Sequence, residues 1–215
     1  MFDLGFQVET AEAVAFSAAP LLAFKLRITA LDKDNPSPRI QTIALQCQIR
    51  IEPARRQYST AEQAGLLDLF GEPQRWSQTL KSMLWTHAGL VVPPFEGTTL
   101  VDLPVACTFD FTVAATKYFY ALEAGTIPII LLFSGTIFHE GPEGLLATAQ
   151  IPWDKEARFQ LPAAAWRQLM ELYYPNSAWL SLRRDVFDRL YQYKTQLGLP
   201  TWEQTLDRLL PAAGK

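Results

Sequence analysis

The amino-acid sequence predicts a mainly β protein, an antiparallel β-sandwich of the C2-like or immunoglobulin-like kind, with a helical insertion and a C-terminal helical tail. Two stretches, residues 39–51 and 101–113, alternate apolar side chains with mostly polar ones. A period of two places one set of side chains on one face of a strand, as in an antiparallel sheet that is covered on one side. After Pro152 the spacing of apolar residues changes to the i, i+3, i+4 pattern of helices.

The strand over 22–30 is expected to form a hairpin with the most regular strand, over 39–51. A short strand is predicted over residues 4–9, and a second strand alternates over 22–30. Polar, turn-forming residues fill 32–38 and connect it to the strand over 39–51. That strand carries five apolar side chains in one phase: Ile43, Leu45, Cys47, Ile49 and Ile51.

A helical insertion is predicted over residues 59–86. Ser59 and Glu62 have the spacing of a capping box, in which the hydroxyl and the carboxylate each accept a hydrogen bond from a free backbone N–H. A second helix is expected from Pro73 to about Trp85, because four apolar side chains share one helical face: Trp76, Leu80, Met83 and Leu84. The insertion ends in a stiff segment over 91–95.

Three further strands complete the predicted sandwich. The alternation over 101–113 predicts one long strand, and Pro104 on its opposite phase indicates an edge strand or a bulge. Residues 127–138 are apolar in both phases, which is typical of a strand that is covered on both faces. A turn over 139–144 then leads to a partner strand over 145–151.

The C-terminal part is predicted to be helical. We expect a sandwich domain over residues 1–161 and C-terminal helices over 162–215 that pack on it. Pro162 suits the first position of a helix, and Pro175 ends that helix. A second apolar stripe follows, and Thr201 caps a last short helix.

The composition argues against nucleic-acid binding. Of 215 residues, 49% are hydrophobic and 19% are charged, and the net charge is −3 without a long run of one sign. A nucleic-acid binder needs a basic footprint that displaces counterions from phosphate. The low charged fraction, against about 25% in average chains, fits either a surface that contacts a partner protein or a monomer with a large core. A homo-oligomer is a further alternative.

No secretory signal or transmembrane segment is expected. The Met1-Phe2-Asp3 start lacks a positive n-region. The longest apolar stretch, 127–138, is shorter than the roughly 18 residues that cross a bilayer. The expected compartment is therefore the cytoplasm.

The two cysteines are expected to be reduced. Cys47 and Cys107 have roughly the spacing of an immunoglobulin inter-sheet pair, but a helix start at Ser59 occupies the region where those domains carry a core Trp. Both cysteines are in phase with apolar neighbours, where a free Cys acts as a small hydrophobic residue.

No catalytic, cofactor or metal site is recognisable, so a non-enzymatic protein-binding or scaffold module is the first functional hypothesis. His139-Glu140 opens like a zinc-protease motif, but Glu143 stands where the second His is required. The sequence contains no G-x-S-x-G nucleophile elbow and no glycine-rich phosphate loop.

Two alternative functions are kept. A C2-like calcium or membrane-surface module could use Asp32 and Asp34, and calorimetry without any calcium heat would dispose of it. An enzyme could assemble an unrecognised site from Asp110, His87 and Glu140, which requires a pocket that gathers these groups.

Aromatic residues are the most unusual feature of the C-terminal part. Tyr and Trp are enriched at protein interfaces because they combine a large contact area with a polar tip. Four of them lie on the predicted apolar stripes and are expected to seat the helices on the sandwich: Trp166, Tyr173, Trp179 and Tyr193. Tyr174 and Tyr191 lie off the stripes and are the predicted partner contacts.

Three motifs follow one another along the chain: the Phe2-Asp3-Leu4 start, the Tyr118-Phe119-Tyr120 run before an apolar strand, and Trp179-Leu180 after Tyr173-Tyr174-Pro175. In this order the chain resembles an uncharacterised bacterial family found beside uptake NiFe-hydrogenase genes. The resemblance implies an accessory role in hydrogenase assembly or maturation, with a hydrogenase component as partner. It supplies no catalytic residues, and metal delivery would need the Cys and His clusters that this chain lacks.

Overall fold

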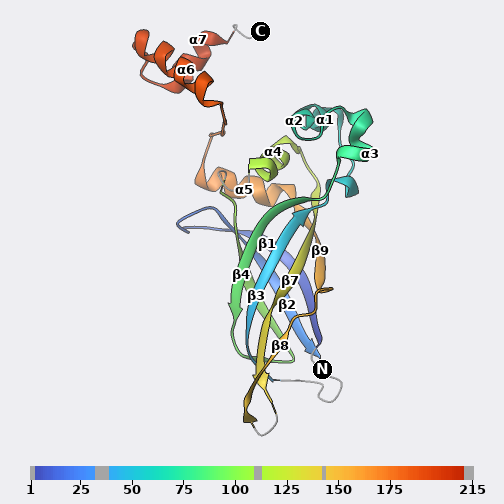
Figure 1. The fold of residues 1–215 in the computed structure, drawn as a ribbon. Coiled ribbons are helices and arrows are strands. Elements are labelled where there is room, and N and C mark those ends of the chain that lie inside the picture. The colour runs from blue at the N-terminus through green and yellow to red at the C-terminus, as the bar shows by residue number, and fades with distance from the viewer. Residues whose placement is uncertain (1–2, 32–38, 109–112, 142–143, 211–215) are drawn as a thin grey trace. The chain divides into compact units, whose positions relative to one another are not determined.

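The computed structural model describes residues 3–31, 39–108, 113–141 and 144–210. The chain divides into two compact units, residues 1–177 and 178–215. We call them the β unit and the C-terminal unit and describe each by itself (Figure 1).

Two antiparallel sheets form the β unit. The first has the strand order β1–β2–β6, with β1 (Asp3–Val14), β2 (Leu21–Leu31) and β6 (Thr98–Ala106). β1 and β2 form a hairpin, and Pro104 is tolerated in β6 because that strand is the outermost of its sheet. The predicted hairpin between residues 22–30 and 39–51 is wrong, because β2 pairs with β1 and β6 whereas β3 lies in the other sheet.

The second sheet is centred on β3 (Arg39–Ile51), with β4 (Met83–Val92) on one side and β7 (Thr126–Glu140) on the other. The far edge of β7 pairs with two shorter strands in turn. These are β9 (Glu156–Pro162) and β8 (Leu146–Gln150). The two-residue β5 (Phe95–Glu96) pairs with the start of β3.

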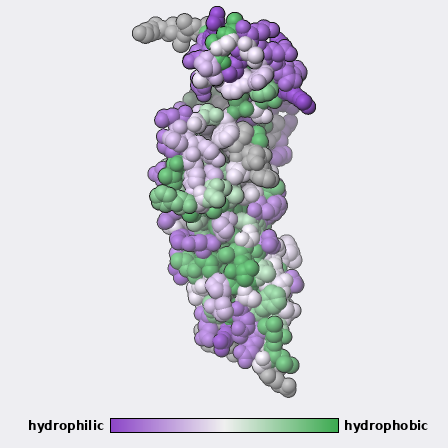
Figure 2. All heavy atoms as spheres, turned by 90° about the vertical axis from the view of Figure 1, so that its left-hand side faces the viewer, coloured by the Kyte–Doolittle hydropathy of each residue, from purple (hydrophilic) through white to green (hydrophobic). Residues whose placement is uncertain are grey.

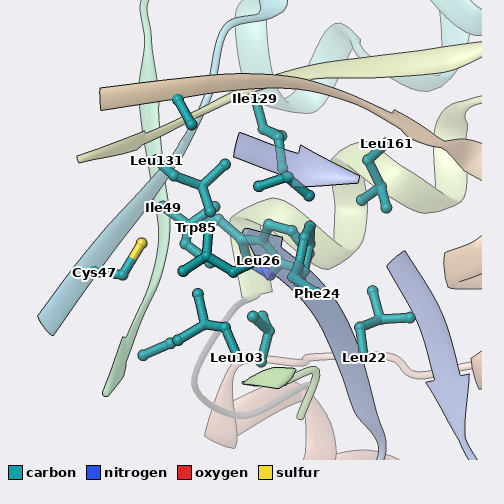
Figure 3. Close-up of a cluster of buried hydrophobic side chains, with 14 of the residues drawn as sticks. Leu22, Phe24, Leu26, Cys47, Ile49, Trp85, Leu103, Ile129, Leu131 and Leu161 are labelled. Carbon is teal, nitrogen blue, oxygen red and sulfur yellow. The ribbon is translucent and has the colours of Figure 1, made fainter. Parts of the chain in front are cut away.

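The core lies between the two sheets, as the alternation of residues 39–51 predicts. Every second residue of β3 from Ile43 to Ile51 is buried. Figure 3 shows side chains from both sheets pointing toward one another. The Phe24 ring of β2 lies 6.1 Å from Trp85 of β4 and 6.0 Å from Phe159 of β9, edge to face. The predicted antiparallel sandwich is therefore confirmed.

Short helices gather at one end of the β unit (Figure 1). The chain between β3 and β4 forms η1 (Pro53–Arg55), α1 (Thr60–Gly65), α2 (Leu67–Phe70), η2 (Pro73–Arg75) and α3 (Trp76–Thr79). The predicted capping box is present, since the Ser59 side chain accepts from the Glu62 N–H and the Glu62 side chain accepts from the Ser59 N–H. α4 (Val113–Ala121) and α5 (Ala163–Tyr173) complete this end.

The prediction of one long strand over 101–113 is wrong at its C-terminal end. β6 stops at Ala106, after which the Cys107 N–H donates to the Pro20 carbonyl at 2.9 Å. Val113 begins α4, in which the buried residues have helical spacing: Ala115, Thr116, Tyr118 and Phe119. Residues 109–112 lie outside the described part.

The prediction of a helix as far as Trp85 is also wrong. α3 ends at Thr79, and Met83 begins β4, where it pairs with Ile51. Ile49 and Arg50 of β3 pair with Thr86 and Leu84, so Trp85 is an extra residue that bulges β4. The alternation of β4 is therefore broken, and its first residues imitate a helical stripe. The helical insertion is therefore shorter than residues 59–86.

The C-terminal unit contains two helices in its described residues, α6 (Arg184–Gln196) and α7 (Trp202–Leu209). The predicted cap of the last helix is confirmed, because the Thr201 side chain accepts from the Gln204 N–H at 3.2 Å. Lys194 closes the turn between the helices by donating to the Leu199 carbonyl at 2.7 Å and to the Pro200 carbonyl at 3.0 Å.

Candidate functional site

A buried ion pair lies at the helical end of the β unit. Arg56 follows η1 and forms a salt bridge with Glu62 of α1, and the two side chains are only 11% and 5% exposed. Arg56 also donates to the carbonyls of Thr126 and Ala124, each at 2.7 Å. The pair therefore fastens the insertion to the loop that precedes β7.

Every oxygen of the Glu62 carboxylate is engaged. One accepts from Arg56 and from the Glu123 N–H at 2.9 Å, and the other accepts from the Ser59 N–H at 3.1 Å. Burial alone would raise the pKa of Glu62, but these backbone N–H groups and the Arg56 guanidinium hold it below its ordinary 4.5. The carboxylate stays ionised and fully bonded, so this cluster has the character of a structural clamp.

Next to the clamp, aromatic rings fill the junction between helices and sheets. The Tyr58 hydroxyl donates to the Pro53 carbonyl at 2.8 Å and lies 2.8 Å from the Tyr118 hydroxyl. Burial raises the pKa of both Tyr58 and Tyr118, which therefore remain neutral donors. Further rings pack edge to face around them: Phe70, Trp76, Trp85 and Phe119.

A shallow groove of about 320 Å³ opens between α1, α2 and α4. Its floor is largely apolar, and its rim carries Lys117 and Asp68, whose charged atoms lie 3.7 Å apart. Tyr120 is 69% exposed beside it. The groove is lined by Gly65, Asp68, Leu69, Lys117, Tyr120 and Ala121. This lining is suited to an apolar contact, and it offers no nucleophile beside a base.

Aromatic side chains also gather in the C-terminal unit. Phe187, Tyr191 and Trp202, which we call the aromatic trio, have ring centroids 5.5–6.3 Å apart. The Lys194 ammonium lies 5.8 Å from the Trp202 ring centroid, a cation–π contact. Tyr191 is 56% and Phe187 44% exposed, so the trio presents an exposed aromatic surface.

The two predicted contact residues lie in different units. Tyr174 follows α5 in the β unit and is half-buried, with its N–H donating to the Met170 carbonyl at 2.7 Å. Tyr191 belongs to α6 and the aromatic trio. Two rings expected to seat helices do so within the β unit, since Trp166 is buried and Tyr173 is half-buried in α5.

The residues named for the alternative functions do not form a site in the described part of the chain. His87 pairs across from Gln48, which itself pairs with Leu132 of β7. Glu140 lies at the end of β7, eight residues beyond Leu132, or roughly 26 Å at about 3.3 Å per residue. Asp110, Asp32 and Asp34 lie outside the described residues.

Neither cysteine is poised for chemistry. Both are buried free thiols, and burial raises the pKa of Cys47 and of Cys107 to about 12. Thiols of that pKa are protonated near neutral pH and are poor nucleophiles. Among the described residues, no group of three or more His, Cys, Asp or Glu side chains could hold a metal ion. No helix of that part is long and apolar enough to span a membrane.

The fold and the surfaces together define an antiparallel β-sandwich protein with a helical end and a short, aromatic two-helix unit. A model of a protein family of unknown function, DUF6084, matches residues 1–215, and the chain belongs to that family. The search among curated proteins found no match.

Proposed function

We propose that the protein is a non-enzymatic protein-binding module that engages its partner through the C-terminal unit. One observation carries the proposal. Among the described residues of this unit, Thr205 is the only buried side chain. The large apolar residues left exposed include Leu180, Phe187, Tyr191, Leu206, Leu209 and Leu210.

The size of the unit explains why this exposure points to binding. Two helices of 13 and 8 residues are too short to be stable from helix propensity alone. Helices of this length are normally stabilised by burying an apolar face, and Tyr, Trp and Phe are enriched at protein interfaces. The aromatic trio is thus best explained as a contact surface.

The class of partner is proposed from the resemblance noted above. A component of hydrogenase assembly or maturation is the partner that it suggests, with the chain acting as a scaffold and not as a metal carrier. The described residues offer no ligand cluster that would favour metal delivery.

A matched pair of double variants tests the proposal. The tagged chain is purified from its native host, its partner is identified by mass spectrometry, and the complex is reconstituted from purified proteins. Phe187→Ser with Tyr191→Ser should weaken binding by about 30-fold or more, as expected for interface hot spots. The control, Val91→Thr with Leu100→Thr, changes two exposed apolar residues on strands. Equal affinities for both variants and the wild type would refute the proposal.

A further inference from the structure

The turn between β1 and β2 holds a phenylalanine in an unfavourable conformation. Phe16 has a φ of 59° and is 102% exposed. A bulky residue at positive φ is an outlier, whereas Gly and Asn adopt this region readily. Asn176 is the other non-glycine residue at positive φ among the described residues, and its type suits the conformation. Because the Phe16 ring is in solvent, no packing of the ring offsets the cost of its unfavourable backbone conformation.

A tyrosine from α5 fixes this turn. The Tyr173 hydroxyl donates to the Val14 carbonyl at 2.8 Å and accepts from the Ser17 N–H at 2.8 Å. The Ser17 hydroxyl lies 2.7 Å from the same oxygen. Phe16 therefore lies between Val14 and Ser17, which are both hydrogen-bonded to the Tyr173 hydroxyl. The helix that carries Tyr173, α5, lies against this end of the hairpin (Figure 1). The exposed ring is presented from a preorganised turn.

The chemistry of the turn favours an apolar contact. Residues 13–24 contain no Asp, Glu, Lys, Arg or His. The face drawn in Figure 2 shows hydrophobic residues of the β unit in separate patches with hydrophilic residues between them. Strained residues that the surrounding structure holds in place are concentrated at binding and active sites.

The strength of membrane binding expected from one ring shows whether Phe16 suits a protein pocket or a lipid surface. A single myristoyl chain gives only marginal membrane binding, and one benzyl side chain is smaller still. Anionic lipids would require basic residues, which 13–24 lack. A buried aromatic anchor is, in contrast, a common hot spot within a larger protein interface.

We infer that Phe16 is a preorganised docking residue that inserts its ring into an apolar pocket of a partner protein. This inference goes beyond the proposed role of the C-terminal unit, because it assigns a separate contact point to the β unit. Tyr173 is a positioning residue, which acts by holding the turn.

Stability and binding should respond to Phe16 in opposite ways. Phe16→Asn removes the ring but suits positive φ, so its Tm should equal or exceed that of the wild type. A Tm clearly below the wild type would mean that the fold requires the ring, and this would overturn the inference.

Photo-cross-linking in the native host identifies the partner. Benzoylphenylalanine replaces Phe16 in the full chain, and in a control it replaces Trp153, which is 94% exposed before β9. The inference expects one protein cross-linked at position 16 and absent at 153. That protein, once purified, should bind Phe16→Asn about 30-fold more weakly than the wild type and bind Trp153→Ser within about threefold.

Several outcomes would overturn the inference. These are no cross-link at position 16 above the level at 153, a cross-link only to a second copy, and an affinity unchanged by Phe16→Asn. Sedimentation with phosphatidylcholine vesicles that depends on Phe16 would instead assign the turn to a lipid surface. The Phe187 and Tyr191 double variant, measured against the same protein, separates the two proposals: if it binds normally while Phe16→Asn does not, only the role of the C-terminal unit fails.

Discussion

The hydroxyl groups of Tyr58 and Tyr118 lie 2.8 Å apart at the junction between the helical insertion and α4. Because the Tyr58 proton goes to the Pro53 carbonyl, Tyr118 is the donor between the two rings. Tyr118 thus donates to Tyr58 and Tyr58 donates to Pro53, so Tyr58 takes part in two hydrogen bonds and Tyr118 in one. The two hydroxyls therefore contribute unequally to stability.

We expect Tyr58→Phe to destabilise the protein more than Tyr118→Phe. Loss of the Tyr118 hydroxyl removes one hydrogen bond, at a cost of about 1 kcal/mol. Loss of the Tyr58 hydroxyl removes the acceptor of the Tyr118 hydroxyl and the donor to the Pro53 carbonyl, so two polar groups lose their partner at a cost of about 2–3 kcal/mol. Urea unfolding of the two variants measures the difference, and the reverse order would contradict the assigned direction of the bonds.

Glu62→Gln should lower the free energy of unfolding by about 3 kcal/mol at pH 7, because it leaves the Arg56 charge buried without its counter-charge. The pKa of Glu62 in the folded protein lies below its ordinary 4.5. Its ionisation therefore stabilises the fold above about pH 4.5, and this contribution is lost as the pH falls through the folded pKa. The wild type and the variant should converge in acid. Glu171→Gln, at an exposed position, serves as the control; a gap that stays constant down to pH 3 would contradict the argument.

Gly135→Ala should be among the most damaging single changes in the chain. Gly135 has a φ of 139°, and a Cβ there would lie 2.0 Å from the Ala44 carbonyl oxygen of β3. The residue sits where β7 changes partner from β9 to β8, and its carbonyl accepts from the Ile151 N–H at 2.9 Å. We expect a loss of at least about 3 kcal/mol.

Gly5→Ala provides the matched glycine control. A Cβ at Gly5 would meet its nearest neighbour only at 3.9 Å, so the change should stay within about 0.5 kcal/mol. Thermal unfolding of both variants tests the pair. A tolerated Gly135→Ala would mean that β3 and β7 are less tightly apposed than described.

Two truncations should behave differently. A chain that ends at Ser177 keeps every hydrophobic side chain that is buried among the described residues and should remain folded. A chain that ends at Leu161 loses α5, in which Trp166 and Leu169 are buried, and should aggregate because it exposes that part of the core. Circular dichroism and size-exclusion chromatography measure both. Aggregation of the longer fragment would contradict the division into two units.

The elements predicted correctly are those whose signal is local. The alternation of β3, the Ser59–Glu62 capping box and the Thr201 cap each depend on residues close in sequence. The first residues of β4, Met83 to Trp85, are predicted to be helical because the bulge at Trp85 breaks the period of the strand. β9 is not among the predicted strands although Ala157, Phe159 and Leu161 alternate, because the strand is short and the apolar spacing after it is helical.

The surfaces were less predictable than the strands. Tyr191 could be singled out because it lies off the apolar stripe of its helix. The Arg56–Glu62 clamp depends on the carbonyls of Ala124 and Thr126, which are far from Arg56 in the sequence. No local sequence pattern predicts these hydrogen bonds. The positive φ of Phe16 is likewise invisible in sequence, because the residue type argues against that conformation.

Hydrogen exchange on the purified full chain tests the central claim most directly. That claim is that the apolar faces of α6 and α7 are exposed in the chain alone and are covered by a partner protein. We predict that amides of residues 184–209 exchange far faster than those of β3, and that the partner slows them by at least about tenfold. Protection of these helices equal to that of β3 in the chain alone would mean that their apolar faces are already buried, and it would contradict the account.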